Sequence, residues 1–285
     1  MPNYIRHRGN QGTNVPNTGR GPSPYIWGDC PWLEMESDPG LGVKFFDDFT
    51  EFGLPGTQTT QINLGQYKVY NTGAATIANK NGFPSTEVSG GVIAMLCDTD
   101  GDQSVIGTQS SPYLLNSTAG KLWFEARAAV TGIGIDNVQY FLGLGETGVA
   151  TSFGAAHPLG NDDVSNTNAG MIGFSMLEGG IGVLNTSYTD RTSSTWTNVQ
   201  SGVGTFAAHT WKKLGMIYDP EDSTSAVKFY VDGVEQTSVI SAATLAALTN
   251  IDAKGLGFLF AMFADSAGTS TYGYLDWVRI AQLAA

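Results

Sequence analysis

Charged residues are scarce in this chain of 285 residues. Asp, Glu, Lys and Arg together make up 14% of it, well below the roughly 25% of an average soluble protein. Thr, Ser, Asn and Gly, or a partner, must therefore cover the surface. The formal net charge is −12. Because an acidic body repels nucleic acid at long range, the composition predicts no nucleic-acid partner.

Cysteine and histidine are almost missing as well. Cys30 and Cys97 are too few for the dense disulfide framework of a small secreted domain. We expect two free, buried thiols, with a bridge between them as the alternative. His7, His157 and His209 lie far apart, and no Gly-x-Ser-x-Gly or Cys-His signature accompanies them. The chain is therefore predicted not to be an enzyme.

Long apolar runs are also missing. No window approaches the roughly 20 apolar residues that cross a membrane, and residues 1–8 lack the apolar run of a signal peptide. The sequence therefore predicts no membrane partner and a chain made and retained in a cytoplasm. Because no period of 20–50 residues repeats along the chain, a solenoid or propeller is excluded as well.

The chain does contain a series of runs in which apolar and polar residues alternate. Residues 211–219 and 227–233 are such runs, bounded by Asp-Pro and Asp-Gly. They predict two antiparallel strands with solvent on one face. Similar runs occupy residues 121–130, 139–145, 255–263 and 273–281. The series predicts a β-sandwich, with one short helix over residues 241–248.

The strand motifs LWFEARAAV, YFLGLGET, WKKLGMIYD, VKFYVDGV and YLDWVRIAQ follow one another in this order. Together they resemble the concanavalin A-like jelly roll (LamG or lectin-like), and in particular structural proteins of tailed-bacteriophage virions. The resemblance spans residues 45–282. It implies an all-β, concanavalin A-like jelly-roll β-sandwich. It also implies a capsid decoration or cement protein at the capsid surface, which binds the major capsid protein and further copies of itself as a trimer or dimer.

Residues 1–42 precede the predicted sandwich domain, residues 43–285. They are rich in Asn, Gly, Pro, Thr and Arg, and the prolines favour an extended arm. Aromatic residues and Arg are the usual anchors of an interface. The arm is therefore predicted to bind the capsid subunit and stabilise the shell through Tyr4, Arg6, Arg8, Arg20, Tyr25, Trp27 and Trp32. The alternative is that the arm folds back and buries its rings on its own sandwich.

An acidic loop offers the best candidate ligands for a metal. Asp98, Asp100 and Asp102 alternate around Gly101, and such oxygen donors suit a structural Ca²⁺. No other cofactor is expected. Gly107 stands where an EF-hand would place its closing acidic residue, so an acidic turn between two strands is the alternative.

Glucanases and lectins share the fold that the resemblance implies, so hydrolysis and sugar binding are two further functions to consider. Retaining glucanases carry a Glu-x-Asp-x-x-Glu pattern that puts their carboxylates on one face of a strand. This sequence lacks the pattern, and Glu125 is interpreted as an outward strand residue near Arg127. Sugar binding needs an exposed aromatic platform with convergent polar groups. Tyr188, Arg191 and Trp196 are the candidates, so the alternative function is a carbohydrate-binding adhesin or tail-fibre lectin.

Overall fold

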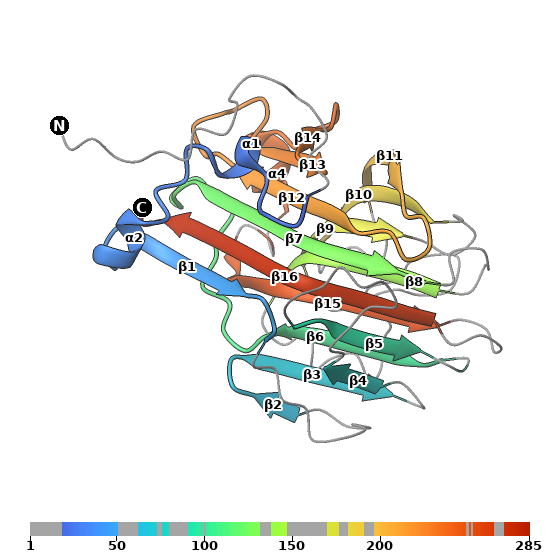
Figure 1. Cartoon of the computed structure of the whole chain (residues 1–285). Helices are drawn as coiled ribbons and strands as arrows, with labels where there is room; N and C mark the ends of the chain where they lie inside the picture. Colours follow the sequence, from blue (N-terminus) through green and yellow to red (C-terminus); the bar gives the residue numbers. More distant parts are fainter. Residues whose placement is uncertain are drawn as a thin grey trace.

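Two antiparallel sheets stacked face to face form the protein (Figure 1). This arrangement confirms the predicted all-β, concanavalin A-like jelly-roll β-sandwich. The computed structural model describes residues 19–50, 62–72, 76–79, 91–97, 99, 101–131, 138–146, 170–176, 182–190, 197–248, 251, 253–264 and 271–285.

The first sheet, called sheet A below, carries the surface on which the candidate site lies. Its strands are β1 (Gly42–Asp47), β4 (Thr76–Asn79), β5 (Ile93–Cys97), β7 (Leu122–Val130), β12 (Lys212–Tyr218), β13 (Val227–Val231), β14 (Val234–Glu235) and β16 (Thr271–Leu283). They follow the order β14-β13-β12-β7-β16-β5-β4, and β1 also pairs with β16. The long strand β16 is therefore shared: its first half pairs with β5 and its second half with β1.

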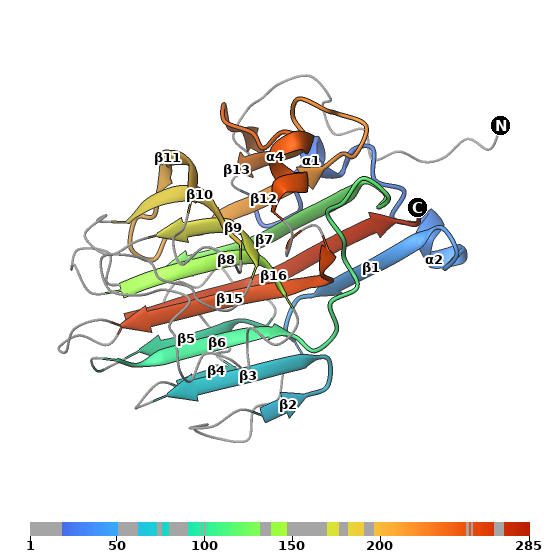
Figure 2. The same cartoon turned by 180° about the vertical axis from the view of Figure 1, so that it is seen from behind.

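The second sheet, sheet B, lies behind sheet A and is seen in front in Figure 2. Its strands are β2 (Ile62–Leu64), β3 (Tyr67–Thr72), β6 (Gln103–Thr108), β8 (Val138–Glu146), β9 (Met171–Met176), β10 (Val183–Thr189), β11 (Thr197–Thr205) and β15 (Leu256–Ala264). Their order is β11-β10-β9-β8-β15-β6-β3-β2. The strands expected from the alternating runs are all present in the two sheets.

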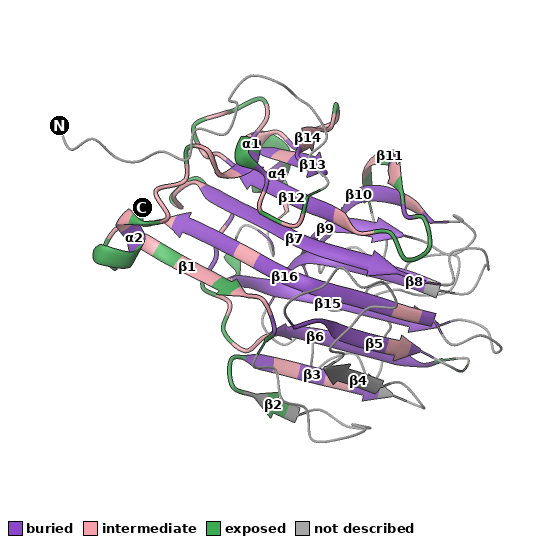
Figure 3. Cartoon of the chain, viewed as in Figure 1, coloured by how far each residue is buried: buried purple, intermediate pink, exposed green. Residues whose placement is uncertain are grey.

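The main core fills the space between the sheets, where one side chain in two points inward from each strand. Phe124 and Ala126 of β7 face Phe258 and Phe260 of β15 in this core. Phe174 and Phe229 contact each other edge to face across the sheets, with ring centroids 5.7 Å apart. Buried residues dominate the central strands in Figure 3. The size and continuity of this core explain why the chain needs no disulfide.

Three short helices accompany the sheets: α1 (Pro24–Trp27), α2 (Glu34–Ser37) and α4 (Ala242–Ala247). Helix α4 confirms the expectation for residues 241–248, and the Ser241 hydroxyl caps it by accepting from the Thr244 amide at 3.1 Å. Helices α1 and α2 were missed, because four residues are too few to show a helical period. No helix of the described part is long and apolar enough to cross a membrane.

Residues 19–41, called the N-terminal segment below, lie across the outer face of sheet A (Figure 1). Ile26 and Met35 are buried there in a cluster that includes Trp123 and Tyr230. Gly215 makes room for this packing, since a side chain at that position would collide with Ile26. For residues 19–41 the structure thus shows the alternative in which the arm folds back on its own sandwich.

The structure places four of the predicted capsid anchors within this packing, and their binding to a capsid subunit stays a prediction. Arg20, Trp27 and Trp32 contact the chain's own sheet A or the segment itself. Tyr25 packs against the ring of Tyr230, and the Tyr25 side chain remains 44% exposed. The physical reason is that the outer face of sheet A carries apolar and charged side chains that need a cover. Tyr4, Arg6 and Arg8 lie outside the described residues.

Replacing Ile26 with Ala measures how firmly the segment belongs to the fold. Ile26 is fully buried, so Ile26→Ala is expected to lower the free energy of unfolding by about 3 kcal/mol. Leu33→Ala removes a similar side chain that is 57% exposed in the same segment. This control should change the free energy of unfolding by less than about 0.5 kcal/mol. Urea denaturation of the two variants checks this, and equal effects would contradict the packing.

Candidate functional site

The predicted calcium ligands are only partly within the described chain. Asp98 and Asp100 lie outside it, while Asp102 is fully buried and its Oδ2 accepts from the Thr99 amide at 2.8 Å. Gly101 between them has a φ of +80°, so the described part of this loop has the form of an acidic turn. Among the described residues no group of three His, Cys, Asp or Glu side chains could hold a metal.

The predicted sugar platform is likewise only partly described. Tyr188 lies on β10, half buried, and packs against the main core. Arg191 and Trp196 fall outside the described residues. The platform stays a prediction, and the one member that the structure places is engaged in packing.

Both cysteines are free, because they lie on opposite sides of sheet A. Cys97 belongs to the core between the sheets, and Cys30 belongs to the N-terminal segment, which packs on the outer face. Burial raises the pKa of Cys30 to about 12, so its thiol stays protonated and unreactive at neutral pH.

Asp276 is a fully buried carboxylate on the outer side of sheet A. It lies where the pairing of β16 with β7 shifts by one residue, between Leu275 and Trp277. Arg127 donates to its Oδ2 at 2.6 Å, and Arg20 donates to its Oδ1 at 2.7 Å. A carboxylate in such a dry place requires charged hydrogen-bond donors. Arg20 supplies one from the far end of the sequence and thereby fixes the start of the N-terminal segment.

Glu125, on β7, is a second fully buried carboxylate on this face. Its Oε2 accepts from the Ser23 amide at 2.9 Å and from the Trp27 indole nitrogen at 2.8 Å. Burial raises the pKa of Glu125 despite these donors. Glu125 does face outward from the sheet, as interpreted from the sequence, but the N-terminal segment covers it and leaves it fully buried.

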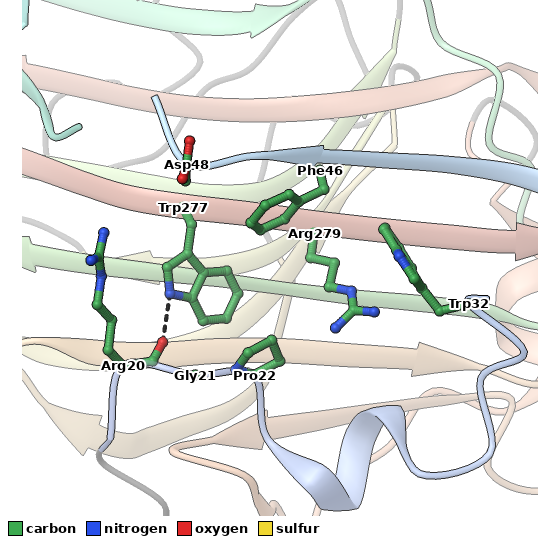
Figure 4. Close-up of a pocket in the computed structure, with 8 residues that line it drawn as sticks. All are labelled: Arg20, Gly21, Pro22, Trp32, Phe46, Asp48, Trp277 and Arg279. Atoms are coloured by element: carbon green, nitrogen blue, oxygen red, sulfur yellow. Dashed lines mark hydrogen bonds between the residues drawn. The ribbon is translucent and has the colours of Figure 1, made fainter. Parts of the chain in front are cut away.

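Between the N-terminal segment and β1 lies a groove of about 500 Å³, drawn in Figure 4. β16 contributes the side chains between the two walls. The start of the segment forms one wall and the end of β1 the other. The lining residues are Arg20, Gly21, Pro22, Trp32, Phe46, Asp48, Trp277 and Arg279. This volume falls within the range of small-ligand sites.

The walls of the groove are fixed by the contacts of the segment. Trp277 donates its indole N–H to the carbonyl oxygen of Arg20 at 2.7 Å, while the Arg20 side chain is held by Asp276. Lys213 of β12 donates to the Gly21 carbonyl oxygen at 2.8 Å. The groove is therefore formed before any ligand arrives.

Aromatic rings and one cation give the groove its chemistry. Phe46 is 51% exposed. The guanidinium carbon of Arg279 lies 3.8 Å from the ring centroid of Trp32 and 4.4 Å from that of Trp27. At the other end of the groove, Asp48 and Arg20 lie on opposite walls, on either side of Trp277 (Figure 4). Apolar ring faces with a few convergent polar groups are typical of sites that bind sugars.

Sequence reasoning found Arg20 and Trp32 but assigned them to a capsid interface, and it missed Phe46, Trp277 and Arg279. Alternation along each strand does place the last three on the outward side of their strands. What the sequence did not show is that β1 pairs with β16, which sets Phe46 directly opposite Arg279.

Comparisons with known proteins identify the fold and no family. No family model matches the chain, and no curated protein matches it. Among solved structures, a protein of unknown function from Shewanella oneidensis MR-1 is similar with a TM-score of 0.52 and 13% identity, over 89% of this chain and 94% of that one. An endo-1,3-beta-glucanase from Streptomyces sioyaensis is similar with a TM-score of 0.51 and 16% identity, over 85% of this chain and 96% of that one. An endo-beta-1,4-glucuronan lyase from the fungus Trichoderma reesei is similar with a TM-score of 0.50 and 10% identity, over 83% of this chain and 94% of that one.

The prediction that the chain is not an enzyme is contradicted by these neighbours. Two of the three are enzymes, although their identities of 16% and 10% carry the likeness no further than the fold. The error lay in treating the missing Gly-x-Ser-x-Gly, Cys-His and Glu-x-Asp-x-x-Glu patterns as a test of every enzyme on this fold.

The raised pKa of Glu125 gives a pH-dependent prediction. The folded protein keeps this proton to a higher pH than the unfolded chain, whose glutamate titrates near the ordinary value of 4.5. The unfolded chain thus loses its proton first, and the contribution of Glu125 to the free energy of unfolding falls as the pH rises above about 4.5.

Glu125→Gln removes this titration and keeps an oxygen for the Ser23 and Trp27 donors. Urea denaturation from pH 4 to 8 should show the variant gaining stability relative to the wild type as the pH rises. A difference that is independent of pH, or that falls with pH, would contradict the buried, proton-retaining carboxyl.

Proposed function

We propose that the protein is a carbohydrate-binding jelly-roll protein and that the groove between the N-terminal segment and β1 is its binding site. The single observation that carries this proposal is the half-exposed ring of Phe46 in a preformed groove that Trp32 and Trp277 also line. A large ring exposed at a groove wall is unfavourable in water, and the apolar face of a sugar ring covers it well.

Polar groups in the groove match the hydroxyls that such a ring carries at its edge. Asp48 offers acceptors at one end, and Arg20 and Arg279 offer donors along the length. A few fixed polar groups among apolar walls give orientation and specificity. Because the walls are held by Asp276 and Trp277, little entropy is lost when a ligand orders them.

The similar structures support this proposal at the level of the fold. Their names include a glucanase and a glucuronan lyase, so proteins with this sandwich fold include enzymes that act on saccharides. The position of the site on this chain rests on the groove alone, since one fold hosts many functions.

Phe46→Ala should weaken saccharide binding roughly five- to tenfold, because aromatic stacking contributes about 1 kcal/mol or more. The matched control is Val43→Ala, since Val43 is 46% exposed on the same strand but points to the other face. A glycan array identifies ligands, and calorimetry compares the variants. A Phe46→Ala protein that binds as the wild type does would rule out this groove as the site.

A second candidate function, the virion role that the resemblance implies, has one observation in its favour. β1 pairs with β16 along one edge and has no strand partner on its other edge among the described residues. Val43 and Phe46 are exposed on it, and Leu33 of the N-terminal segment is 57% exposed. An edge strand with exposed apolar side chains is a surface for association, which suits the major capsid protein or further copies of this chain at a capsid surface.

Truncation tests this second candidate. Deleting residues 1–18 removes Tyr4, Arg6 and Arg8 but keeps Arg20 and Ile26, on which the fold depends. If the arm carries capsid attachment, the truncated protein should fold with unchanged thermal stability and fail to sediment with capsids. Sedimentation at the level of the full chain would contradict a virion role of the arm.

A further inference from the structure

Arg279 differs from the other cations of the outer face of sheet A because it makes neither an ion pair nor a hydrogen bond within the described part of the chain. Lys213 also has no ion pair there, but it donates to the Gly21 carbonyl. Arg20 and Arg127 pair with Asp276, and Lys212 pairs with Asp232. The further ion pairs on the described part of this sheet and segment are Lys44 with Glu36, Lys121 with Asp29 and Asp219, and Lys228 with Asp222. Arg279 makes no ion pair or hydrogen bond with any described residue, and its Nε is buried without an acceptor.

The two indole rings leave Arg279 only one way to gain a partner. Trp27 and Trp32 contact the guanidinium at 4.4 and 3.8 Å from their centroids, and such contacts lie over the faces of an aromatic ring. Neither ring accepts a hydrogen bond from the guanidinium edge, which carries five N–H donors. The edge that is not buried opens into the groove, where Arg279 is a lining residue (Figure 4).

The acid nearest in the sheet does not neutralise this charge. Glu125 lies directly opposite Arg279 in the pairing of β7 with β16, but its Oε2 accepts from Ser23 and Trp27 instead. Burial lowers the pKa of Arg279 and raises that of Glu125. The nearby Cys30, Glu125 and Glu36 offset the effect of burial on the pKa of Arg279 only in part.

We propose that Arg279 receives an anionic substituent, a carboxylate or a sulfate, of the saccharide that binds in the groove. This inference rests on the proposed function and adds the class of ligand, an acidic sugar. An arginine edge donates two parallel hydrogen bonds to such a group, which are stronger than those to a neutral hydroxyl.

The register of the strands fits this assignment. Phe46 lies directly opposite Arg279 in the pairing of β1 with β16, so their Cβ atoms are separated by only about 5 Å. A sugar ring stacked on Phe46 therefore has its substituents within reach of the guanidinium. At the far end of the groove, Arg20 is already occupied by Asp276, which leaves Arg279 as the cation that the anion meets.

Calorimetry on the full-length protein tests the inference with three probes: a disaccharide that contains glucuronic acid, its neutral glucose counterpart and a sulfated disaccharide. The acidic probes should bind about tenfold more tightly than the neutral one, and raising the salt concentration should weaken only the acidic ones. Arg279→Gln should reduce the acidic probes to the affinity of the neutral probe. Lys68→Gln, a change of a cation on sheet B with no ion pair among the described residues, should leave all three unchanged.

The outcomes separate this inference from the proposed function. Neutral and acidic probes that bind equally tightly to the wild type would overturn the inference and leave carbohydrate binding intact. If none of a broad set of saccharides binds, both proposals fall. Since the comparison of probes and the salt series use the wild type, they decide the matter even if Arg279→Gln does not fold. Preference for the carboxylate or the sulfate identifies the source of the anion.

Discussion

Two fully buried carboxylates on the outer face of sheet A, Asp276 and Glu125, constrain the rest of the molecule. A buried carboxylate that lacks donors costs several kcal/mol, so this face cannot be left without a cover. Arg20, the Ser23 amide and the Trp27 indole supply the missing donors. The N-terminal segment is therefore part of the sandwich and not an appendage to it.

The groove forms because the N-terminal segment and β1 leave part of the outer face of sheet A uncovered between them. The segment crosses β7 and β12, turns through α2 and returns as β1 on the far side of β16. The space that it leaves open lies over Trp277 and Arg279, with walls that come from opposite ends of one short stretch of chain. The same ion pair that fixes Arg20 thus also fixes the wall of the candidate site, and an uncompensated Arg279 remains where a ligand would lie.

Much of the fold could be predicted from the sequence, and little of the site. Alternation along β7, β12 and β16 predicted the strands, and the short helix α4 was expected. The prediction of solvent on the outer face of β12 and β13 was wrong, because Ile217 and Tyr230 are buried there under the N-terminal segment. The aromatics of residues 19–41 suggested a surface for the rings to lie against, but composition does not say whose surface, and the structure packs Trp27 and Trp32 partly buried on the chain's own sheet A. Glu125 was judged from its strand alone, and a strand does not show that a segment about a hundred residues away covers it. Phe46 and Arg279 became neighbours only through the pairing of β1 with β16, which no local pattern encodes.

Hydrogen exchange of three backbone amides tests the central claim most directly. Ser23 donates its amide to Glu125, and Ile26 and Trp27 donate theirs to the Ser23 carbonyl. If the segment is built into the sandwich, these amides should exchange as slowly as those of β7 and β16. Exchange at the rate of an unstructured peptide, with the two strands still protected, would show that the segment is no part of the fold and that the groove does not exist.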